Sequence, residues 1–258
     1  MDRMFSTCIL PVATLSLLIA TASQAQDFRI ESEIFIGTQK QPVSENLTLF
    51  KDGRVYDFML GEPNEVTVYD SLEEEFVLLD PKRRVQSTMT CDNILAFVAR
   101  LKTTARRNKE PFIFDPYFDI AYDAKGGWVT LSSSRIIYRV KGAKPSDPRV
   151  VVQYRRFADW YARLNCMVPG SMPPFARIEM NKAMALRDLI PQRVELTINP
   201  RPRSTAKKVN VSSRHLVTWE LSKMDHSRIA TANKFMDSFS KVHYNDFRKV
   251  SSVATNRR

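Results

Sequence analysis

Glycine, histidine and cysteine are scarce in this chain of 258 residues, which has 7 Gly, 3 His and 3 Cys. The sequence contains no GxGxxG or GxxxxGK[ST] pattern, and these loops need glycines where the backbone approaches a phosphate group. It also lacks HExxH, CxxC and GxSxG, and the spacing of its histidines is not that of metal ligands. These absences argue against the common nucleotide, zinc and hydrolase sites. We therefore expect a binding protein without cofactor or metal rather than an enzyme.

Carboxylates are the catalytic groups that the sequence leaves open. Asp57, Asp70 and Asp80 each end or interrupt an expected strand. Aspartates at such positions commonly cap turns, because the side chain accepts hydrogen bonds from the backbone N–H groups that follow. Two carboxylates facing each other could instead serve a hydrolase. The distance between them decides this, so a hydrolase remains an alternative.

Acidic residues are few in the second half of the chain. Residues 141–258 carry 23 Lys and Arg against 9 Asp and Glu, whereas residues 1–140 carry 16 against 19. This asymmetry predicts either an anionic partner or a solvated basic surface. The arginines expected on one helix form the candidate patch for such a partner, and they are Arg149, Arg155, Arg156 and Arg163.

A long apolar run occurs only near the start of the chain. Arg3 precedes the apolar stretch 9–22, and Ser23-Gln24-Ala25 supplies small residues at a cleavage site. This pattern predicts a signal peptide over residues 1–25, with cleavage near Ala25 and export to the periplasm or another exported compartment. Residues 26–258 then form a single α+β domain, with a possible internal boundary near 141–148. Export also argues against nucleic acid as a partner.

Two cysteines remain after that cleavage, Cys91 and Cys166. An oxidising compartment permits one disulfide between them, and two separately buried thiols are the alternative.

An antiparallel meander organises the first half of the chain. Short apolar runs alternate with turn residues, and Asp52-Gly53 is a strong hairpin signal because glycine readily adopts positive φ. The expected strands are Leu47–Phe50, Val55–Leu60, Val66–Tyr69, Phe76–Leu79 and Val85–Met89. An earlier strand covers 28–36, and later strands follow at 128–132, 135–140, 193–198 and 211–221.

Helices are expected between and after these strands. Apolar residues recur at helical spacing over 90–107, 148–165, 175–189 and 225–243. Residues 248–258 are expected to fray. Several strands are apolar on both faces, so both faces need covering. The sequence therefore predicts an α+β fold, a curved antiparallel sheet covered by helices.

Three segments of the meander carry a resemblance to a known family. They are Leu49–Asp57 (LFKDGRVYD), Val68–Asp70 (VYD) and Val77–Pro81 (VLLDP). Residues 27–140 resemble the LolA-like periplasmic lipoprotein carriers, the outer-membrane lipoprotein-sorting proteins. The long basic second half departs from that compact pattern.

The resemblance implies an incomplete barrel whose concave face holds acyl chains beneath covering helices. The expected function is then an exported, non-enzymatic carrier of a lipid or lipoprotein ligand. The alternative is a cell-envelope protein that binds anionic partners through its basic half. The side chains expected to line an apolar trough are Tyr56, Phe58, Tyr69, Leu78, Phe97, Leu101 and Trp128. A fully packed core is the competing interpretation of the same residues.

Overall fold

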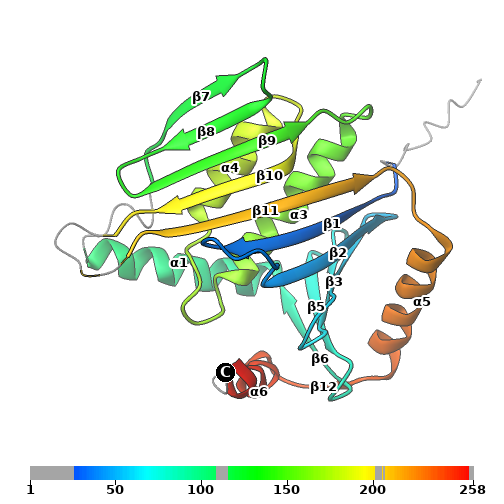
Figure 1. Ribbon diagram of the computed structural model, residues 1–258. Helices are drawn as coiled ribbons and strands as arrows, with labels where there is room; N and C mark the ends of the chain where they lie inside the picture. Colours follow the sequence, from blue (N-terminus) through cyan, green and yellow to red (C-terminus); the bar gives the residue numbers. More distant parts are fainter. Residues whose placement is uncertain (1–25, 109–115, 201–204, 206, 256–258) are drawn as a thin grey trace, which may run out of the picture.

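One large sheet dominates the computed structural model, which describes residues 26–108, 116–200, 205 and 207–255. The predicted signal peptide lies outside these residues. The described part contains twelve strands in the order β12-β6-β5-β4-β3-β2-β1-β11-β10-β9-β8-β7 (Figure 1). Neighbouring strands are antiparallel, except that β12 pairs in parallel with β6. The strands are β1 Phe28–Ile36, β2 Ser44–Lys51, β3 Arg54–Met59, β4 Val66–Asp70, β5 Glu75–Asp80, β6 Val85–Thr90, β7 Asp119–Asp123, β8 Trp128–Ser132, β9 Ile136–Ala143, β10 Ile190–Ile198, β11 Val209–Thr218 and β12 Ser240–Lys241.

The predicted meander is confirmed as β2 to β6, each strand pairing with the next. At the β2–β3 turn Asp52 and Gly53 have φ of 51° and 80°, the left-handed conformation that the Asp-Gly pair predicts. The remaining strands join this meander through β1, which pairs with β11 from Arg29 opposite Thr218 to Ile36 opposite Val211. The sheet therefore includes strands from both sides of residues 141–148.

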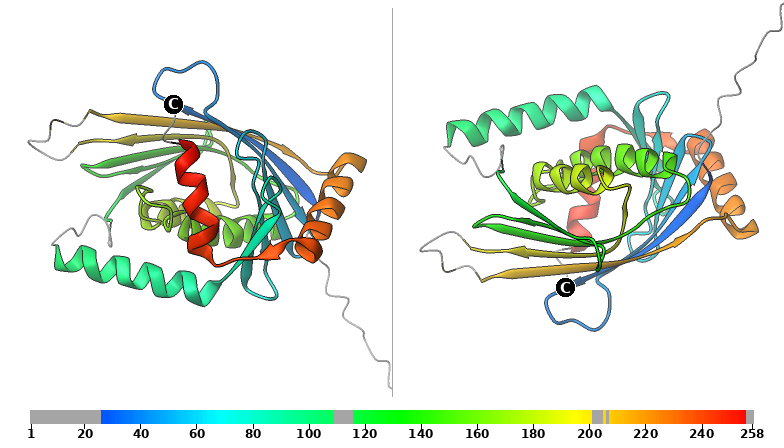
Figure 2. Two further views of the ribbon diagram at one scale, coloured as in Figure 1. Left: turned by 90° about the horizontal axis from the view of Figure 1, so that it is seen from below. Right: turned by 90° about the horizontal axis from the view of Figure 1, so that it is seen from above.

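Five helices lie around the described sheet: α1 Cys91–Arg107, α3 Arg149–Asn165, α4 Phe175–Ala185, α5 Lys223–Ser238 and α6 Tyr244–Thr255. The sheet bends, and α3 and α4 lie on its concave side (Figure 2). Helix α5 packs against the opposite face of the meander. Both faces of the meander are therefore covered, as its apolar residues predict. An α+β fold with a large, mostly antiparallel and uncompleted sheet is confirmed.

Three apolar clusters follow from the alternation of side chains along the strands. The first lies between the concave face of the meander and α1, α3 and α6, where Phe28 stacks on Phe50 with ring centroids 4.1 Å apart. The second lies between α4 and strands β8 to β10. The third lies between α5 and the other face of the meander, around Leu47 and Leu49. The concave side is thus packed with side chains from the helices.

The prediction of one helix over 225–243 followed by a frayed tail is wrong. Helix α5 ends at Ser238, β12 follows, and α6 continues to Thr255. The side chain of Phe247 on α6 is fully buried in the first cluster, and this burial stabilises the last helix. Arg83 Nη2 also donates to the Phe247 carbonyl at 2.6 Å. None of the described helices has the length and hydropathy that a membrane crossing requires.

Cys91 and Cys166 are free thiols, so the expected disulfide is not formed and the alternative of two buried thiols describes the structure. Cys91 begins α1 and Cys166 follows α3, and both side chains pack in the first cluster. The thiol of Cys166 donates to the carbonyl of Arg163 at 3.0 Å instead. Burial is the main reason that the pKa of each thiol rises to about 11, which keeps both protonated.

Gly142 on β9 allows a close approach between the sheet and the segment after α4. A Cβ atom added there would lie 2.8 Å from both Leu189 Cβ and Met184 Cε. We expect Gly142→Ala to lower the free energy of unfolding by about 1–3 kcal/mol, because an added methyl group overpacks the core. Chemical denaturation measures this change. Gly61→Ala is the matched control, since no atom lies within 4 Å of its added Cβ. Equal stability of the two variants would contradict the prediction.

Candidate functional site

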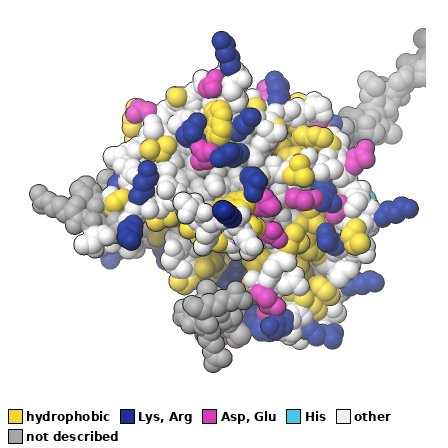
Figure 3. Space-filling view, viewed as in Figure 1, with side chains coloured by type: hydrophobic (Ala, Val, Ile, Leu, Met, Phe, Trp, Pro, Cys, Tyr) yellow, Lys and Arg dark blue, Asp and Glu magenta, His cyan; other side chains and the backbone are white. Residues whose placement is uncertain are grey.

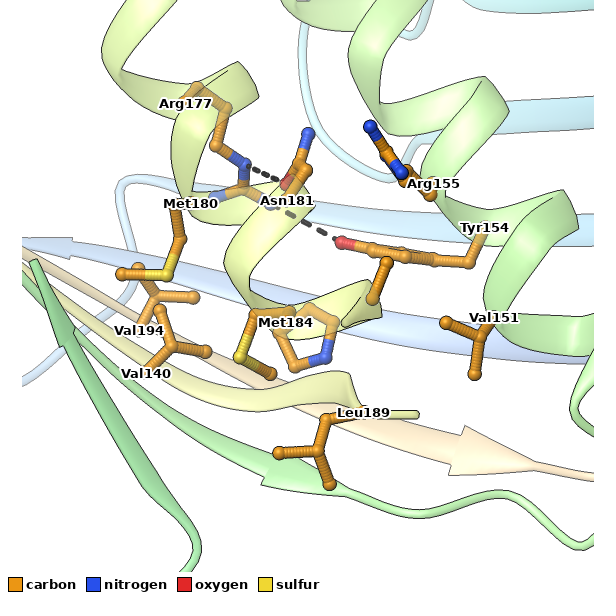
Figure 4. Close-up of a pocket in the computed structure, with 12 residues that line it drawn as sticks. Val140, Val151, Tyr154, Arg155, Arg177, Met180, Asn181, Met184, Leu189 and Val194 are labelled. Atoms are coloured by element: carbon orange, nitrogen blue, oxygen red, sulfur yellow. Dashed lines mark hydrogen bonds between the residues drawn. The ribbon is translucent and has the colours of Figure 1, made fainter. Parts of the chain in front are cut away.

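The concave side of the sheet contains a small apolar pocket between α3, α4 and strands β9 and β10 (Figure 4). Its apolar lining consists of Val140, Val151, Met180, Met184, Ala185, Leu189, Pro191 and Val194. The strand residues reach it because every second side chain of β9 and β10 points to the concave face. The remaining cavity has a volume of about 10 Å³, which is room for about one water molecule. Two of the lining side chains are methionines, which are flexible and fill irregular spaces.

Polar side chains gather at one end of this pocket. Arg177 on α4 donates from Nε to Asn181 Oδ1 at 3.1 Å and from Nη2 to the Tyr154 hydroxyl at 3.2 Å (Figure 4). Asn181 Nδ2 in turn donates to Asp159 Oδ1 at 2.8 Å. An amide therefore stands between the carboxylate of Asp159 and the guanidinium of Arg177. Among the described residues, no carboxylate oxygen lies within 4.0 Å of that guanidinium.

His215 on β11 faces the same concave side. Its Nδ1 lies 2.8 Å from Ser32 Oγ and its Nε2 lies 2.8 Å from Ser213 Oγ, so both ring nitrogens have hydroxyl partners. Burial, followed by the nearby charge of Arg177, lowers the pKa of His215 to about 3. The imidazole is therefore neutral at physiological pH, and it adds no charge beside Arg177. No cluster of metal-ligating side chains was found within the described ranges.

Asp57 on β3 is buried on the concave face beneath α3. It accepts hydrogen bonds from Thr48 Oγ1 at 2.6 Å, Tyr161 Oη at 2.7 Å and Asn46 Nδ2 at 3.0 Å. Burial raises its pKa despite these three donors. All three hydrogen-bond partners of Asp57 are neutral side chains, and none of them is a second carboxylate. The site connects the sheet to α3.

Asp70 and Asp80 act as the turn caps that the sequence suggests. Asp70 Oδ1 accepts from the N–H groups of Leu72 and Glu73, and Asp80 Oδ1 accepts from that of Arg83. Each also pairs with an arginine at 2.6 Å, Arg54 for Asp70 and Arg83 for Asp80.

The residues expected to line a trough are divided between different clusters. Tyr56 and Phe58 lie on the face covered by α5, where Tyr56 Oη donates to Asn233 Oδ1 at 3.1 Å. In contrast, Tyr69, Leu78, Phe97 and Leu101 belong to the cluster on the concave side. Trp128 on β8 lies beneath the guanidinium of Arg139, 4.6 Å from the ring centroid. The seven side chains therefore do not form one wall.

The arginines of the expected basic patch have partners within the protein. Arg149 pairs with Asp147 at 2.8 Å, and Arg155 lies 3.5 Å from Asp159. Arg156 donates to the Ser71 carbonyl at 2.7 Å and pairs with Glu74 at 3.2 Å. Arg163 donates to the Asp159 carbonyl at 2.8 Å and stacks over Trp160.

A wider groove lies at the edge of the sheet, between β6, α1 and the segment from β12 to α6. It has a volume of about 640 Å³ and is open to solvent. Its apolar residues include Met89, Phe97 and Val242, so one predicted lining residue is part of it. Half of the residues around the groove are polar, among them Arg100 and His243.

Arg177, Met180 and Asn181 were not among the site residues predicted from the sequence. The available signal was a lone arginine within an expected helix that also has methionines at helical spacing. No protein-family model matches this chain, and no curated protein matches it either.

The buried carboxyl of Asp57 gives a pH dependence that can be measured. Because its pKa is raised in the folded state, folding favours the protonated form, and the stability that this proton contributes is lost as pH rises through the raised value. Asp57→Asn removes that dependence. We expect the stability of the wild type relative to this variant to fall as pH rises from about 4, the pKa of an unfolded aspartate, and then to level off.

Urea denaturation across this pH range measures the difference. Asp119→Asn on the exposed strand β7 controls for the removal of a carboxylate. A difference between wild type and Asp57→Asn that stays constant with pH would contradict the prediction.

Proposed function

We propose that the protein is an exported, non-enzymatic binding protein that holds an acyl chain between α3, α4 and the concave face of its sheet. The observation that carries this proposal is the apolar pocket there, with lining residues such as Met180, Met184 and Val194 and with polar groups at one end. Such pockets, apolar with a few convergent polar groups, are typical of small-molecule sites. The pocket is nearly filled, so entry of a chain requires α4 to move away from β9 and β10.

The fold supports the proposed likeness to the LolA-like carriers. An uncompleted antiparallel sheet whose concave side is covered by helices is the arrangement that the resemblance implies. The pattern of residues 1–25 supports export, and an exported carrier can exchange lipid or lipoprotein ligands within the cell envelope.

The energetics of an acyl chain suit this arrangement. Burial of a chain stabilises a complex by about 0.8 kcal/mol per CH₂ group, so ten methylenes contribute roughly 8 kcal/mol. Displacing α4 opposes this gain. The helix begins without a side-chain cap at Pro174, and its methionines can adopt new rotamers around a ligand. A ligand can therefore replace protein contacts in the pocket with contacts of the same apolar kind.

The alternative, an envelope protein that uses a basic face against an anionic partner, has less support. The four arginines of the expected patch are engaged within the protein, as described above. Lys and Arg side chains are also spread over the face seen in Figure 3 rather than gathered into one patch.

A matched pair of substitutions tests where the chain binds. Val194→Thr places a hydroxyl in the pocket, and Val242→Thr places one in the edge groove. We expect Val194→Thr to weaken binding of the uncharged probe pyrenedodecanol roughly fivefold or more, because an unpaired hydroxyl is costly beside an apolar chain. Val242→Thr should leave binding unchanged. Fluorescence titration measures the affinities, and thermal unfolding checks that both variants fold.

The reverse result, a loss with Val242→Thr alone, would move the site to the edge groove. Failure of the wild type to bind the probe, with no lipid found by native mass spectrometry after gentle purification, would overturn the proposed function.

A further inference from the structure

The guanidinium of Arg177 is a charge whose hydrogen-bond partners are neutral. It donates to an amide oxygen of Asn181 and to the hydroxyl of Tyr154, and the side chain is only partly exposed. Most charged groups away from water are paired with an opposite charge, since desolvating an ion is costly. The nearest acid along this network, Asp159, is bonded to Asn181 and lies 3.5 Å from Arg155. The carboxylate of Asp159 is therefore already paired with Arg155 and hydrogen-bonded to Asn181.

The surroundings of Arg177 make this end of the pocket positive. Arg177 is close enough to His215 to lower the pKa of that residue further, after burial has lowered it. Burial raises the pKa of Tyr138 on β9 and of Tyr154 on α3, and this effect outweighs the lowering by the nearby charge of Arg177. Both hydroxyls therefore stay protonated. Tyr138, His215 and Tyr154, which face Arg177 from β9, β11 and α3, are thus neutral. The charged groups near it on α3 are Asp159 and Arg155, which also lines the pocket and lies 3.5 Å from Asp159.

We propose that Arg177 binds the anionic head of a single-chain amphiphile, a carboxylate or a phosphate, whose chain lies among Met180, Met184 and Val194. This inference rests on the proposed function, since it concerns the same pocket. A guanidinium offers parallel N–H donors that match the oxygens of either anion. The Tyr154 hydroxyl, now bonded to Nη2, stands where it can donate to the same head group.

Probes with one chain and different heads test the inference. Pyrenedodecanoate, pyrenedodecyl phosphate and uncharged pyrenedodecanol are titrated against the full-length protein by fluorescence. For Arg177→Gln we expect the affinity for at least one anionic probe to fall on the order of ten- to a hundredfold, the effect of losing a hydrogen bond to a charged group. Its affinity for pyrenedodecanol should not fall.

Two further variants complete the design. Arg177→Lys keeps the charge without the planar fork, so an intermediate loss is expected. Arg139→Gln is the matched control, because Arg139 is an exposed arginine on β9 that pairs with Glu195 at 3.0 Å. It should bind every probe as the wild type does. Circular dichroism establishes that each variant is folded, and Arg177→Lys carries the test should Arg177→Gln fail to fold.

The outcomes separate this inference from the proposed function. Equal affinity of wild type and Arg177→Gln for both anionic probes overturns the role of Arg177 and leaves acyl binding standing. If Arg177→Gln does not fold, an unchanged affinity of Arg177→Lys for both anionic probes has the same meaning. Absence of binding for all three probes overturns the proposed function itself. A loss confined to the carboxylate or to the phosphate probe supports the inference and identifies the head group.

Discussion

The antiparallel pairing of β1 with β11 is the constraint on which the rest of the structure depends. It joins the meander of β2 to β6 with the later strands β7 to β10, so that one sheet bends around α3 and α4. The same pairing places Ser32 opposite His215 and so creates the serine partner of that histidine. Arg29 on β1 adds a second connection, because its Nη1 bonds both carboxylate oxygens of Asp225 at the start of α5. Without the pairing of β1 with β11, neither the concave face nor its pocket would form.

The covering helices turn this face from an open trough into a packed interior. Helix α3 supplies Phe157 and Tyr161 to the meander half, and α4 supplies Met180 and Met184 to the other half. The cavity of about 10 Å³ is what remains between them. Ligand binding in such a fold depends on whether the contacts of α4 can be exchanged for those of a chain, because both are apolar and of similar strength per unit area.

Local chemistry made much of the fold predictable. Asp52-Gly53 determines the first hairpin of the meander, and α1 begins after Thr90, whose side chain accepts from the N–H of Asn93. Pairings between distant segments were not predictable, because no local signal selects β11 as the partner of β1.

The candidate site was missed for the same reason. Val55 and Tyr56 are adjacent and both buried, yet alternation directs Tyr56 toward α5 and Val55 toward the concave face, so residue type alone could not identify the lining. That the hydrogen-bond partners of Arg177 are neutral is visible only in the three-dimensional structure.

The ion pair between Arg29 and Asp225 has a consequence for how the protein reaches its native state. The two residues lie 196 positions apart, and the neighbouring β1–β11 ladder spans a similar distance in the sequence. A nascent chain emerges from its N-terminus, so β1 has no β11 to pair with until most of the polypeptide has been made. Contacts of such long range also slow folding, since a large loop must close before they form. The complete sheet can therefore form only late in synthesis, once β11 has been made, whereas the meander of β2 to β6 pairs strands that are neighbours in the sequence.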